Sequence, residues 1–262
     1  MMATKKLQAF PTFSVRDVLL RFVSPLLLLA MWIALYQSQA LPSQILVSPL
    51  QVFEAGRDLY QSGELWTHLQ YSLNRLLFGF AFGGFAGLVF GTLMGGSKLV
   101  ENLCGPTYNT FRQIPTIAFI PILILIFGIG ETFKVVVVAQ AAFFPVAVAT
   151  IDAVKGIPRS YHDVARAYRL SYVQWVKRIV IPATVPPVVT GFRISLQRSW
   201  VVLIAAELMA AESGIGQMME MGRQMLRIDI VMVGVVLTGF IGFMLDWGFR
   251  RLESRLIQWK SN

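Results

Sequence analysis

The polar residues with the clearest chemical potential lie within an otherwise apolar segment, residues 188–209. That segment contains Arg193, Gln197, Arg198, Ser199 and Glu207. Arg198 is close to its middle, where a charged side chain costs about 2.5 to 3.5 kcal/mol on membrane-insertion scales. Such a guanidinium is expected to face the interior of a helix bundle. There it serves either as a counter-charge for an anion or as one half of a permanent ion pair with Glu207 or Asp246.

We predict that this segment lines a path for a substrate. The predicted path residues are Arg198, Ser199, Trp200 and Glu207, together with Gln140 of an earlier apolar segment. Arg193 lies near the N-terminal end of the segment, from which its long side chain can reach the membrane surface. Glu207 is expected either to cap the path or to pair with an arginine of a neighbouring segment.

Motifs for catalysis and for nucleotide binding are absent from the sequence. It contains no GxxxxGK(S/T), GxGxxG or HExxH pattern, and His68 and His162 lie far apart. A single cysteine, Cys104, excludes an intramolecular disulfide and a metal site built from several cysteines. We therefore predict no catalytic residue, no metal site and no cofactor bound by this chain. If ATP drives transport, ATP and Mg must bind to a separate polypeptide.

The composition is that of an integral membrane protein. The chain has 262 residues, of which 55% are hydrophobic and 14% are charged, and its mean hydropathy is +0.61. A soluble domain carries nearer a quarter charged residues. The net charge of +9 invites a nucleic-acid interpretation, but Lys and Arg lie between apolar segments rather than on one continuous face. We therefore predict contact with membrane lipids and none with nucleic acid.

Six apolar segments are candidates for transmembrane helices, and together they predict an all-α polytopic membrane protein. They span residues 22–36, 76–94, 114–127, 133–151, 188–209 and 228–249. The third segment is short and is interrupted by Pro115 and Pro121. A cleaved signal peptide ending at Ser38-Gln39-Ala40 is the alternative for the first segment. The basic stretch before it is long for a signal, so a transmembrane helix is expected there.

Basic and acidic residues alternate between successive connections. Lys and Arg are concentrated at residues 1–21, 98–112, 155–178 and 250–260, whereas most acidic residues lie at 54–64, 131 and 207–229. Cytoplasmic connections of membrane proteins carry the excess of Lys and Arg. The pattern therefore predicts how the chain is oriented across a membrane. Both termini and a long loop at about 152–187 are expected to face the cytoplasm.

One predicted helix carries glycines at a regular spacing. Gly79, Gly83, Gly87, Gly91 and Gly95 are four residues apart, which places them along one face of the helix. Small residues at this spacing allow two membrane helices to approach closely. We predict that another helix packs against this face.

The longest basic interruption between apolar segments, residues 163–187, has the periodicity of a helix. Apolar residues recur at three- and four-residue intervals, and basic residues occupy much of the remaining surface. The apolar positions are Val164, Ala167, Leu170, Val173, Val176 and Val180. This pattern predicts amphipathic helices that lie along a membrane face.

The same interruption resembles the cytoplasmic EAA loop of permease subunits of type I ABC importers. That motif has Glu-Ala-Ala, three residues, Gly, nine residues and then Ile-x-Leu-Pro. Here Asp163-Val164-Ala165, Arg169 and Ile179-Val180-Ile181-Pro182 stand at the same spacings. Arg169 occupies the position of the usual glycine in a turn, and arginine adopts a left-handed backbone only at a cost.

Further residues resemble the sulfonate, taurine and nitrate branch of that family, so the resemblance covers nearly the whole chain. They are Ser62-Gly63-Glu64-Leu65-Trp66, His68, Ser72, Arg75, Pro186, Gly191-Phe192-Arg193, Trp200 and Ala205-Ala206-Glu207. The branch implies the permease subunit of an ATP-driven importer for a small anion, an aliphatic sulfonate or taurine, with nitrate or bicarbonate as the alternative. Two other classes are an ion-coupled secondary transporter and a membrane scaffold. The sequence lacks the internal repeat typical of the former.

The resemblance also implies partners and coupling residues. Asp163, Val164, Ala165, Arg169, Leu170 and Pro182 are expected to contribute to contact with an ATP-binding subunit dimer. A second permease subunit, in a homodimer, and an extracytoplasmic substrate-binding protein complete the expected assembly. ATP is then hydrolysed on the partner, so the chain itself is not expected to be an enzyme. The resemblance also implies a location in the bacterial cytoplasmic (inner) membrane. Two regions are expected: 1–75, an N-terminal lead with the first transmembrane helix and an amphipathic connection, and 76–262, the permease core.

Overall fold

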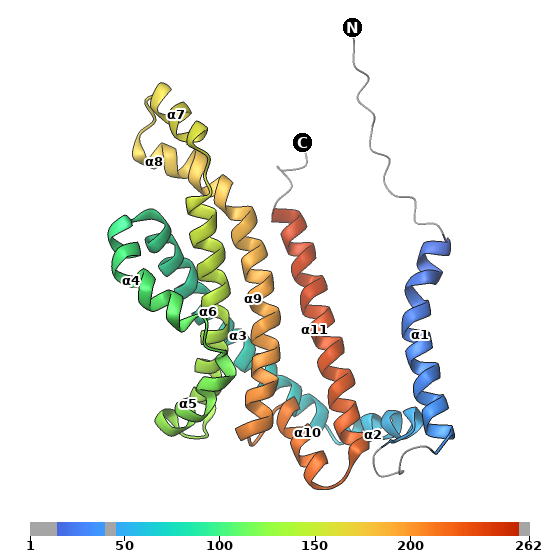
Figure 1. Ribbon diagram of the computed structural model, residues 1–262. Coiled ribbons are helices and arrows are strands. Elements are labelled where there is room, and N and C mark those ends of the chain that lie inside the picture. Colours follow the sequence, from blue (N-terminus) through green and yellow to red (C-terminus); the bar gives the residue numbers. More distant parts are fainter. Residues whose placement is uncertain (1–14, 40–45, 257–262) are drawn as a thin grey trace.

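The computed structural model describes residues 15–39 and 46–256, which are helices joined by short connections (Figure 1). The elements are α1 (Val15–Gln37), α2 (Pro49–Gln61), α3 (Glu64–Gly96), α4 (Lys98–Phe111), η1 (Thr116–Phe119), α5 (Ile120–Phe127), α6 (Glu131–Lys155), α7 (Arg159–Ala167), α8 (Tyr172–Trp175), η2 (Val176–Val180), α9 (Ile181–Ala210), α10 (Ile215–Gln224) and α11 (Ile228–Leu256). The expected all-α membrane fold is confirmed. The basic lead before residue 15 and the tail after residue 256 lie outside the described residues.

Four helical stretches in the described part of the chain are long and apolar enough to cross a membrane. They are α3, α6, the continuous stretch Tyr172–Ala210 that ends with α9, and α11. A fifth candidate consists of α4 followed by η1 and α5, bent by 88°. The third predicted segment, residues 114–127, covers only the second half of this candidate, because Pro115 lies at the break; the first half, α4, was predicted as a basic connection. The six predicted spans are therefore four or five by length and composition, with residues 23–37 of α1 as a shorter apolar helix.

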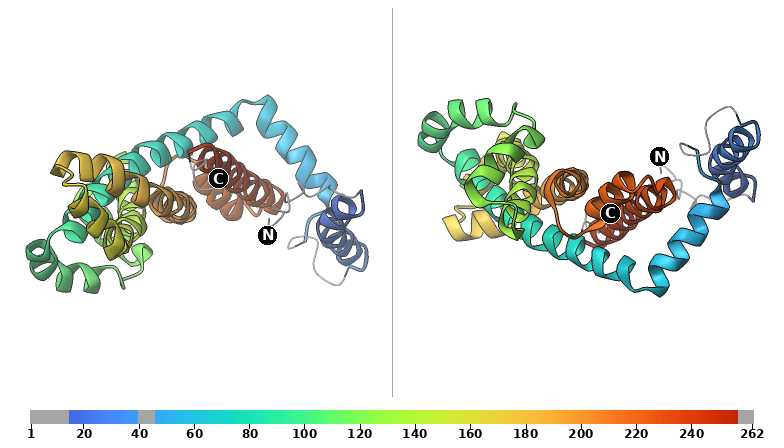
Figure 2. Two further views of the ribbon diagram at one scale, coloured as in Figure 1. Left: turned by 90° about the horizontal axis from the view of Figure 1, so that it is seen from above. Right: turned by 90° about the horizontal axis from the view of Figure 1, so that it is seen from below.

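The long helices lie side by side, and the shorter ones cover their two ends. Figure 1 shows α6, α9 and α11 running in the same general direction, with α7 and α8 at the top and α10 at the bottom. Viewed along this direction, α1 stands at one edge and is joined to the remaining helices through α2 (Figure 2). The predicted coupling loop and the α10 end are thus at opposite ends of the molecule.

The polar stretch between the first two predicted spans forms α2 and the beginning of α3. Ser48 caps α2 in a capping box with Gln51, and Pro49 occupies the first helical turn, where its missing N–H is not needed. Gly63 has φ +81° between α2 and α3, a left-handed conformation that glycine adopts without strain. Helix α3 runs without interruption past residue 75, at which the sequence suggested a division between two regions. That division stays a prediction.

The regularly spaced glycines of α3 pack against α6, as predicted. A Cβ atom added at Gly87 would lie 2.6 Å from the Phe143 carbonyl oxygen, and one added at Gly91 would lie 2.7 Å from that of Ala147. Real Cβ atoms do not approach backbone oxygens so closely, so only glycine allows this separation between the helices. In lipid this packing itself stabilises helix association, since apolar burial from water does not contribute there.

Hydrogen bonds between side chain and backbone join α9 to both of its neighbours. Ser195 Oγ donates to the Ala142 carbonyl of α6 over 3.0 Å, one turn before Pro145 interrupts the backbone ladder of that helix. Trp200 Nε1 donates to the Thr238 carbonyl of α11 over 3.1 Å. Both donors are buried, so each bond satisfies a polar group that lipid or apolar side chains would leave unpaired. These bonds fix which face of α9 is turned toward each neighbour.

Candidate functional site

The coupling loop consists of α7, a tight turn and α8, and its turn has the geometry of a Schellman motif. The Leu170 amide donates to the Ala165 carbonyl, and the Arg169 amide donates to the Arg166 carbonyl. This pair of bonds requires a left-handed residue at the position of Arg169, and Arg169 has φ +46°. The arginine therefore adopts the conformation that glycine provides in the family, at a cost of roughly 1–2 kcal/mol.

The predicted coupling residues divide into exposed and structural positions. Asp163, Val164 and Arg169 are exposed, whereas Ala165 is buried at 9% exposure and Leu170 is half-buried. Pro182 directly follows the π-helical turn η2, inside the continuous helical stretch Tyr172–Ala210. The exposed surface also includes two tyrosines that the sequence did not single out, Tyr168 and Tyr172, at 77% and 76% exposure. Aromatic side chains of this kind are enriched at the centres of protein interfaces.

A cluster of charges, buried at Arg75 and Glu207 and exposed at Glu131, joins the α10 ends of three long helices. Arg75 of α3 is 2% exposed, and its Nη1 donates to Glu207 Oε1 of α9 over 2.8 Å. Glu207, 1% exposed, also accepts from Ser72 Oγ at 2.8 Å and from the Gly216 amide at 3.0 Å. Of the two expectations for Glu207, the structure shows pairing with an arginine of a neighbouring segment.

The same cluster continues to the start of α6. Arg75 donates through Nε and Nη2 to both carboxylate oxygens of Glu131, at 2.5 and 2.6 Å. Glu131 also accepts from Lys134 Nζ at 3.0 Å. Arg75 further donates to the carbonyl and hydroxyl of Ser213, in the connection before α10. Each guanidinium nitrogen is thus hydrogen-bonded, which is the condition under which a buried ionic cluster holds helices together.

Sequence reasoning did not assign a role to Arg75 or Ser72, although both were part of the family resemblance. The signal that could have identified Arg75 is its place just before a predicted apolar span, where a charge must find a partner. Its partners are 56 and 132 residues away in the sequence, however. No local spacing relates them, so only the packing of α3 between α6 and α9 brings them together.

Arg198 has a different environment from Arg75. Among residues 15–39 and 46–256, no carboxylate lies within 4.0 Å of its guanidinium. The suggested ion pair with Glu207 or Asp246 is wrong, because Glu207 is bound by Arg75 and Asp246 by Arg250 and Gln197. Arg193, by contrast, pairs with Glu253 of α11 at 3.0 Å. Arg198 therefore remains exposed beside α6, without a charged partner in the described part of the chain.

Three adjoining cavities follow α6 from its middle toward the coupling loop. The central cavity, about 420 Å³, is lined by Ala141, Phe144 and Pro145 of α6 and by Arg198. The connecting cavity, about 520 Å³, extends from Phe144 to Asp152 and also includes Arg198. The loop-side cavity, about 640 Å³, extends from Val148 to Lys155. Arg112, at the end of α4, lines all three.

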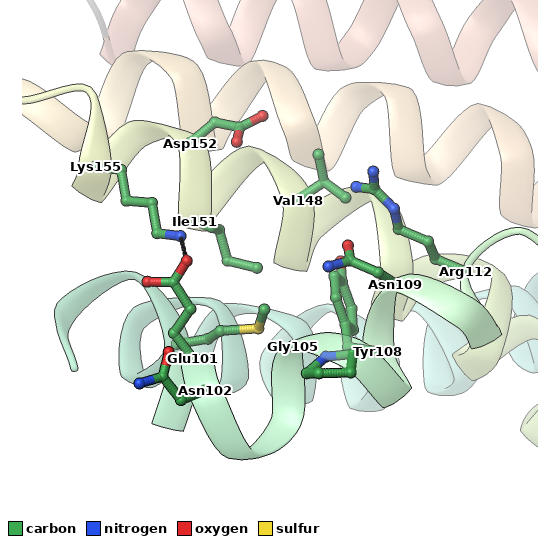
Figure 3. A pocket seen from close by; sticks show the side chains of 12 residues that line it. Glu101, Asn102, Gly105, Tyr108, Asn109, Arg112, Val148, Ile151, Asp152 and Lys155 are labelled. Carbon is green, nitrogen blue, oxygen red and sulfur yellow. Dashed lines mark hydrogen bonds and ion pairs between the residues drawn. The ribbon is translucent and has the colours of Figure 1, made fainter. Parts of the chain in front are cut away.

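The loop-side cavity contains charges of both signs. Figure 3 shows Lys155 of α6 joined to Glu101 of α4, an ion pair of 2.6 Å, and Asp152 of α6 also lines this cavity. The Arg112 side chain reaches from the end of α4 toward α6, where Val148 lies (Figure 3). Tyr108 Oη donates to the Phe144 carbonyl over 3.3 Å. This arrangement holds α4 against α6 while leaving the Arg112 guanidinium on the cavity wall.

The remaining predicted path residues do not line these cavities. Ser199 and Trp200 are buried, and Trp200 is turned toward α11 through its bond to Thr238. Gln140 is half-buried on α6, outside the residues that line the central cavity. Of the five predicted path residues, only Arg198 lies on the cavity wall. Within the described residues, no three His, Cys, Asp or Glu side chains gather so that they could hold a metal ion.

Curated proteins similar to this chain are permeases. It is 32% identical to the taurine transport system permease protein TauC of Escherichia coli over 93% of this chain and 90% of that one. It is 35% identical to a protein of Escherichia coli assigned as the aliphatic sulfonates transport permease SsuC, over 90% and 89% of the two chains. The nitrate import permease NrtB of Synechocystis is 30% identical over 71% and 68%.

Solved structures with the same fold are ABC transporters. A chain of an amino acid ABC transporter crystallised with histidines matches with a TM-score of 0.58 and 15% identity, over 76% of this chain and 94% of that one. The methionine transporter MetNI in an inward-facing conformation matches with a TM-score of 0.52 and 22% identity, over 73% and 95%. A family model described as the inner membrane component of binding-protein-dependent transport systems matches residues 79–258. The chain belongs to that family, and it is an ABC importer permease of the branch that contains the sulfonate, taurine and nitrate permeases.

Proposed function

We propose that this chain forms the membrane path of an ATP-driven importer for a small anion, an aliphatic sulfonate or taurine. Its partners in the proposal are two ATP-binding subunits that hold ATP and Mg, a second copy of this chain and an extracytoplasmic substrate-binding protein. The observation that carries the anionic cargo is Arg198, a mid-span arginine on a cavity wall without a carboxylate partner among the described residues. A charge left in this state within a membrane is costly unless an anion compensates it during transport.

The coupling loop supports the assignment of ATP hydrolysis to a partner subunit. Its exposed residues, Val164 and Tyr168 among them, form an apolar and aromatic surface at the end of the molecule. The Schellman turn fixes α7 relative to α8, so a push on α7 is transmitted as movement of a rigid unit. A cleft on an ATP-binding subunit would accommodate such a unit, with Asp163 and Arg169 at its exposed charged positions.

Movement of this loop would be transmitted toward the cargo along a continuous helical stretch. The stretch Tyr172–Ala210 runs from the loop into α9 without leaving helical structure. Arg198 lies about 24 Å along α9 from Pro182 at a rise of 1.5 Å per residue. A tilt of the loop end would therefore move Arg198 and the cavity wall relative to α6. This gives ATP-driven closure of the partner a direct mechanical effect on the anion path.

The proposed location is the cytoplasmic (inner) membrane of a bacterium, with the coupling loop and both termini in the cytoplasm. The basic loop and the α10 end lie at opposite ends of the bundle (Figure 1). This arrangement supports the orientation that the distribution of Lys and Arg predicts. The α10 end, which carries the buried charge cluster, would then face the extracytoplasmic binding protein.

The alternatives concern either the cargo or the class of membrane protein, and each predicts a different uptake result. Nitrate or bicarbonate is the alternative cargo, and it is supported by the similarity to a nitrate permease. An ion-coupled secondary transporter would take up its substrate without an ATPase, and a membrane scaffold would not transport at all. Uptake that requires both ATP and the ATP-binding subunit separates the importer from these two classes. A comparison of taurine, an alkanesulfonate, nitrate and bicarbonate as cargo then separates the anions.

Arg198→Gln tests the anion path directly. The permease complex with its ATP-binding subunit is reconstituted in liposomes with ATP on the loop side and binding protein on the other. The variant should assemble and hydrolyse ATP at the basal rate, while uptake of taurine falls about ten-fold or more, since a charge-assisted hydrogen bond is lost. Arg255→Gln, an exposed arginine in the last turn of α11, is the matched control. Normal anion uptake by the Arg198 variant would refute the counter-charge role.

A further inference from the structure

We infer that Arg112 and Arg198 together form the binding site for a sulfonate group in the central cavity. The inference rests on the proposed function and adds to it a second anion-binding residue and a substrate class. Arg112 ends α4 at the break before η1, and Arg198 lies near the middle of α9. The two residues are 86 positions apart in sequence, yet both line the central and the connecting cavity.

The lining of the central cavity is positively charged. Its polar members are Arg112, Gln113, Thr116, Gln197 and Arg198, and no carboxylate is among its lining residues. Gln197 donates to Asp246 over 2.7 Å, which orients its amide. That aspartate also pairs with Arg250, so its negative charge is already compensated. The two guanidiniums therefore leave a net positive charge on this wall.

The chemistry of the wall matches a tetrahedral anion that carries a carbon chain. A guanidinium presents a planar fork of N–H donors, and two of them can share the three oxygens of a sulfonate. The remaining lining residues are apolar, including Ile114, Phe144, Val201 and Val202. An apolar wall beside convergent polar groups is the usual composition of a site for a small amphiphilic ligand. Nitrate would use the guanidiniums but would leave this apolar wall without a ligand group.

Arg112 lies at the cavity without a charge that neutralises it. Its neighbour in the cavity wall, Tyr108, carries a neutral hydroxyl. Within the described residues it forms no ion pair. From the sequence it was expected only as one of the basic residues of a connection. Its position opposite Phe144, at the break between α4 and η1, places its charge beside the middle of α6 instead.

The three cavities differ in charge along the direction of transport. Asp152 enters the lining in the connecting cavity, and the loop-side cavity adds the paired Glu101 and Lys155 but lacks Arg198, so the positive charge falls from cavity to cavity. Carboxylates repel an anion, so attraction is strongest at the central cavity and declines toward the coupling loop. An anion released from the central cavity would leave by this end.

Uptake measurements on single and double variants test whether the two arginines bind the same anion. In liposomes containing the complete importer, Arg112→Gln and Arg198→Gln are each expected to lower uptake of taurine and of butanesulfonate about ten-fold or more. Uptake by the double variant should be only slightly lower than uptake by the less active single variant, because residues that bind one group act non-additively. A double variant whose fold-loss of uptake equals the product of the two single losses would overturn the shared site.

Controls separate binding from folding. Tyr108→Phe removes the hydroxyl that bonds the Phe144 carbonyl but keeps the Arg112 guanidinium, so most uptake should remain. Arg112→Lys keeps the charge without the planar fork, and its uptake should lie between those of wild type and Arg112→Gln. Thermal unfolding of each complex is measured in parallel. A Tyr108→Phe complex as inactive as Arg112→Gln would show that Arg112 acts through packing of α4, which overturns its role in binding.

The apolar wall is tested by the length of the carbon chain. Val201→Trp fills space in the central cavity next to Arg198 and should lower uptake of butanesulfonate several-fold more than uptake of taurine, which has the shorter chain. Equal loss of uptake for the two substrates would overturn the assignment of the apolar wall to the carbon chain of the ligand. This test stays informative if an Arg112 variant fails to fold.

The outcomes distinguish this inference from the proposed function. Loss of uptake in Arg198→Gln with normal uptake in Arg112→Gln would overturn the two-arginine site and leave the anion importer in place. Absence of ATP-dependent uptake of taurine, butanesulfonate, nitrate and bicarbonate by the wild-type importer would overturn both.

Discussion

The α10 end of the bundle and its centre contain arginines in opposite circumstances. Arg75 is 2% exposed and is bound by two carboxylates, from α9 and α6. Arg198 is exposed on a cavity wall, and no carboxylate in the described residues lies within ion-pair distance. Both are long cationic side chains on membrane helices, so residue type does not explain the difference. What differs is whether the fold itself supplies the negative charge.

This difference separates a structural role from a transport role. A buried ion pair that loses one partner leaves an uncompensated charge, which is costly in any conformation. Arg75 therefore cannot release its partners during a transport cycle without destabilising the packing of three helices. Arg198 has nothing to release, so it is free to bind a passing anion. Mutations at the α10 end are thus expected to change stability, whereas mutations at the cavity wall in the centre are expected to change uptake.

The largest effect should follow from breaking the buried cluster. Arg75→Met leaves Glu207 and Glu131 without their main partner and should lower the free energy of unfolding by about 3–5 kcal/mol. Arg198→Met, the matched change at the cavity, should alter stability by no more than about 0.5 kcal/mol. Thermal unfolding and yield of the purified complex measure both. Equal loss of stability in the two variants would remove the distinction between the regions.

The tight contact between α3 and α6 should give the next largest effect. Gly87→Leu must move a backbone oxygen 2.6 Å from the new Cβ, and overpacking of this kind costs about 1–3 kcal/mol or more. Gly239→Leu on α11 is the matched control, because no atom lies within 4 Å of a Cβ there. Assembly is measured by size-exclusion chromatography. Similar assembly of the two variants would mean that α3 and α6 need not approach closely.

A smaller effect, confined to coupling, is expected at the exposed loop. Tyr168→Ala should weaken binding of the ATP-binding subunit by about 2 kcal/mol, roughly 30-fold, if it is a central contact. Stability should not change, since the side chain is 77% exposed. Tyr60→Ala on α2, at 73% exposure, is the control. Unchanged substrate-stimulated ATP hydrolysis in the Tyr168 variant would exclude this surface from coupling.

The smallest expected effect is that of Arg169→Gly on stability. Glycine relieves the left-handed strain but gains entropy in the unfolded chain, so the two terms offset to within about 1 kcal/mol. If Arg169 contacts the partner, coupling of ATP hydrolysis to uptake should become less efficient. Arg169→Gln, an unbranched residue that keeps similar backbone strain without the charge, separates the two contributions. A glycine variant as active as wild type would show that the arginine is tolerated and not used.

The sequence predicted the helical spans, the close packing of α3 on another helix and the loop that resembles the EAA motif. Each of these features is a pattern within one contiguous stretch of sequence, so local spacing carries it. The glycine spacing predicted close approach, and the structure identifies α6 as the partner. The Arg169 position predicted an unusual turn, and the structure shows a left-handed arginine in a Schellman motif. The broken span at Pro115 was visible in the sequence as a short segment.

The tertiary structure alone decided which charges have partners. Glu207 and Arg198 are nine residues apart on one helix and were both predicted to line the path. The structure places Glu207 against Arg75 and leaves Arg198 on the cavity wall with Arg112. Helix packing sets these partners, because side chains nine positions apart point in different directions and meet elements distant in sequence. A sequence determines that a charge must be compensated in a membrane, and only the fold determines whether a carboxylate or a cargo compensates it.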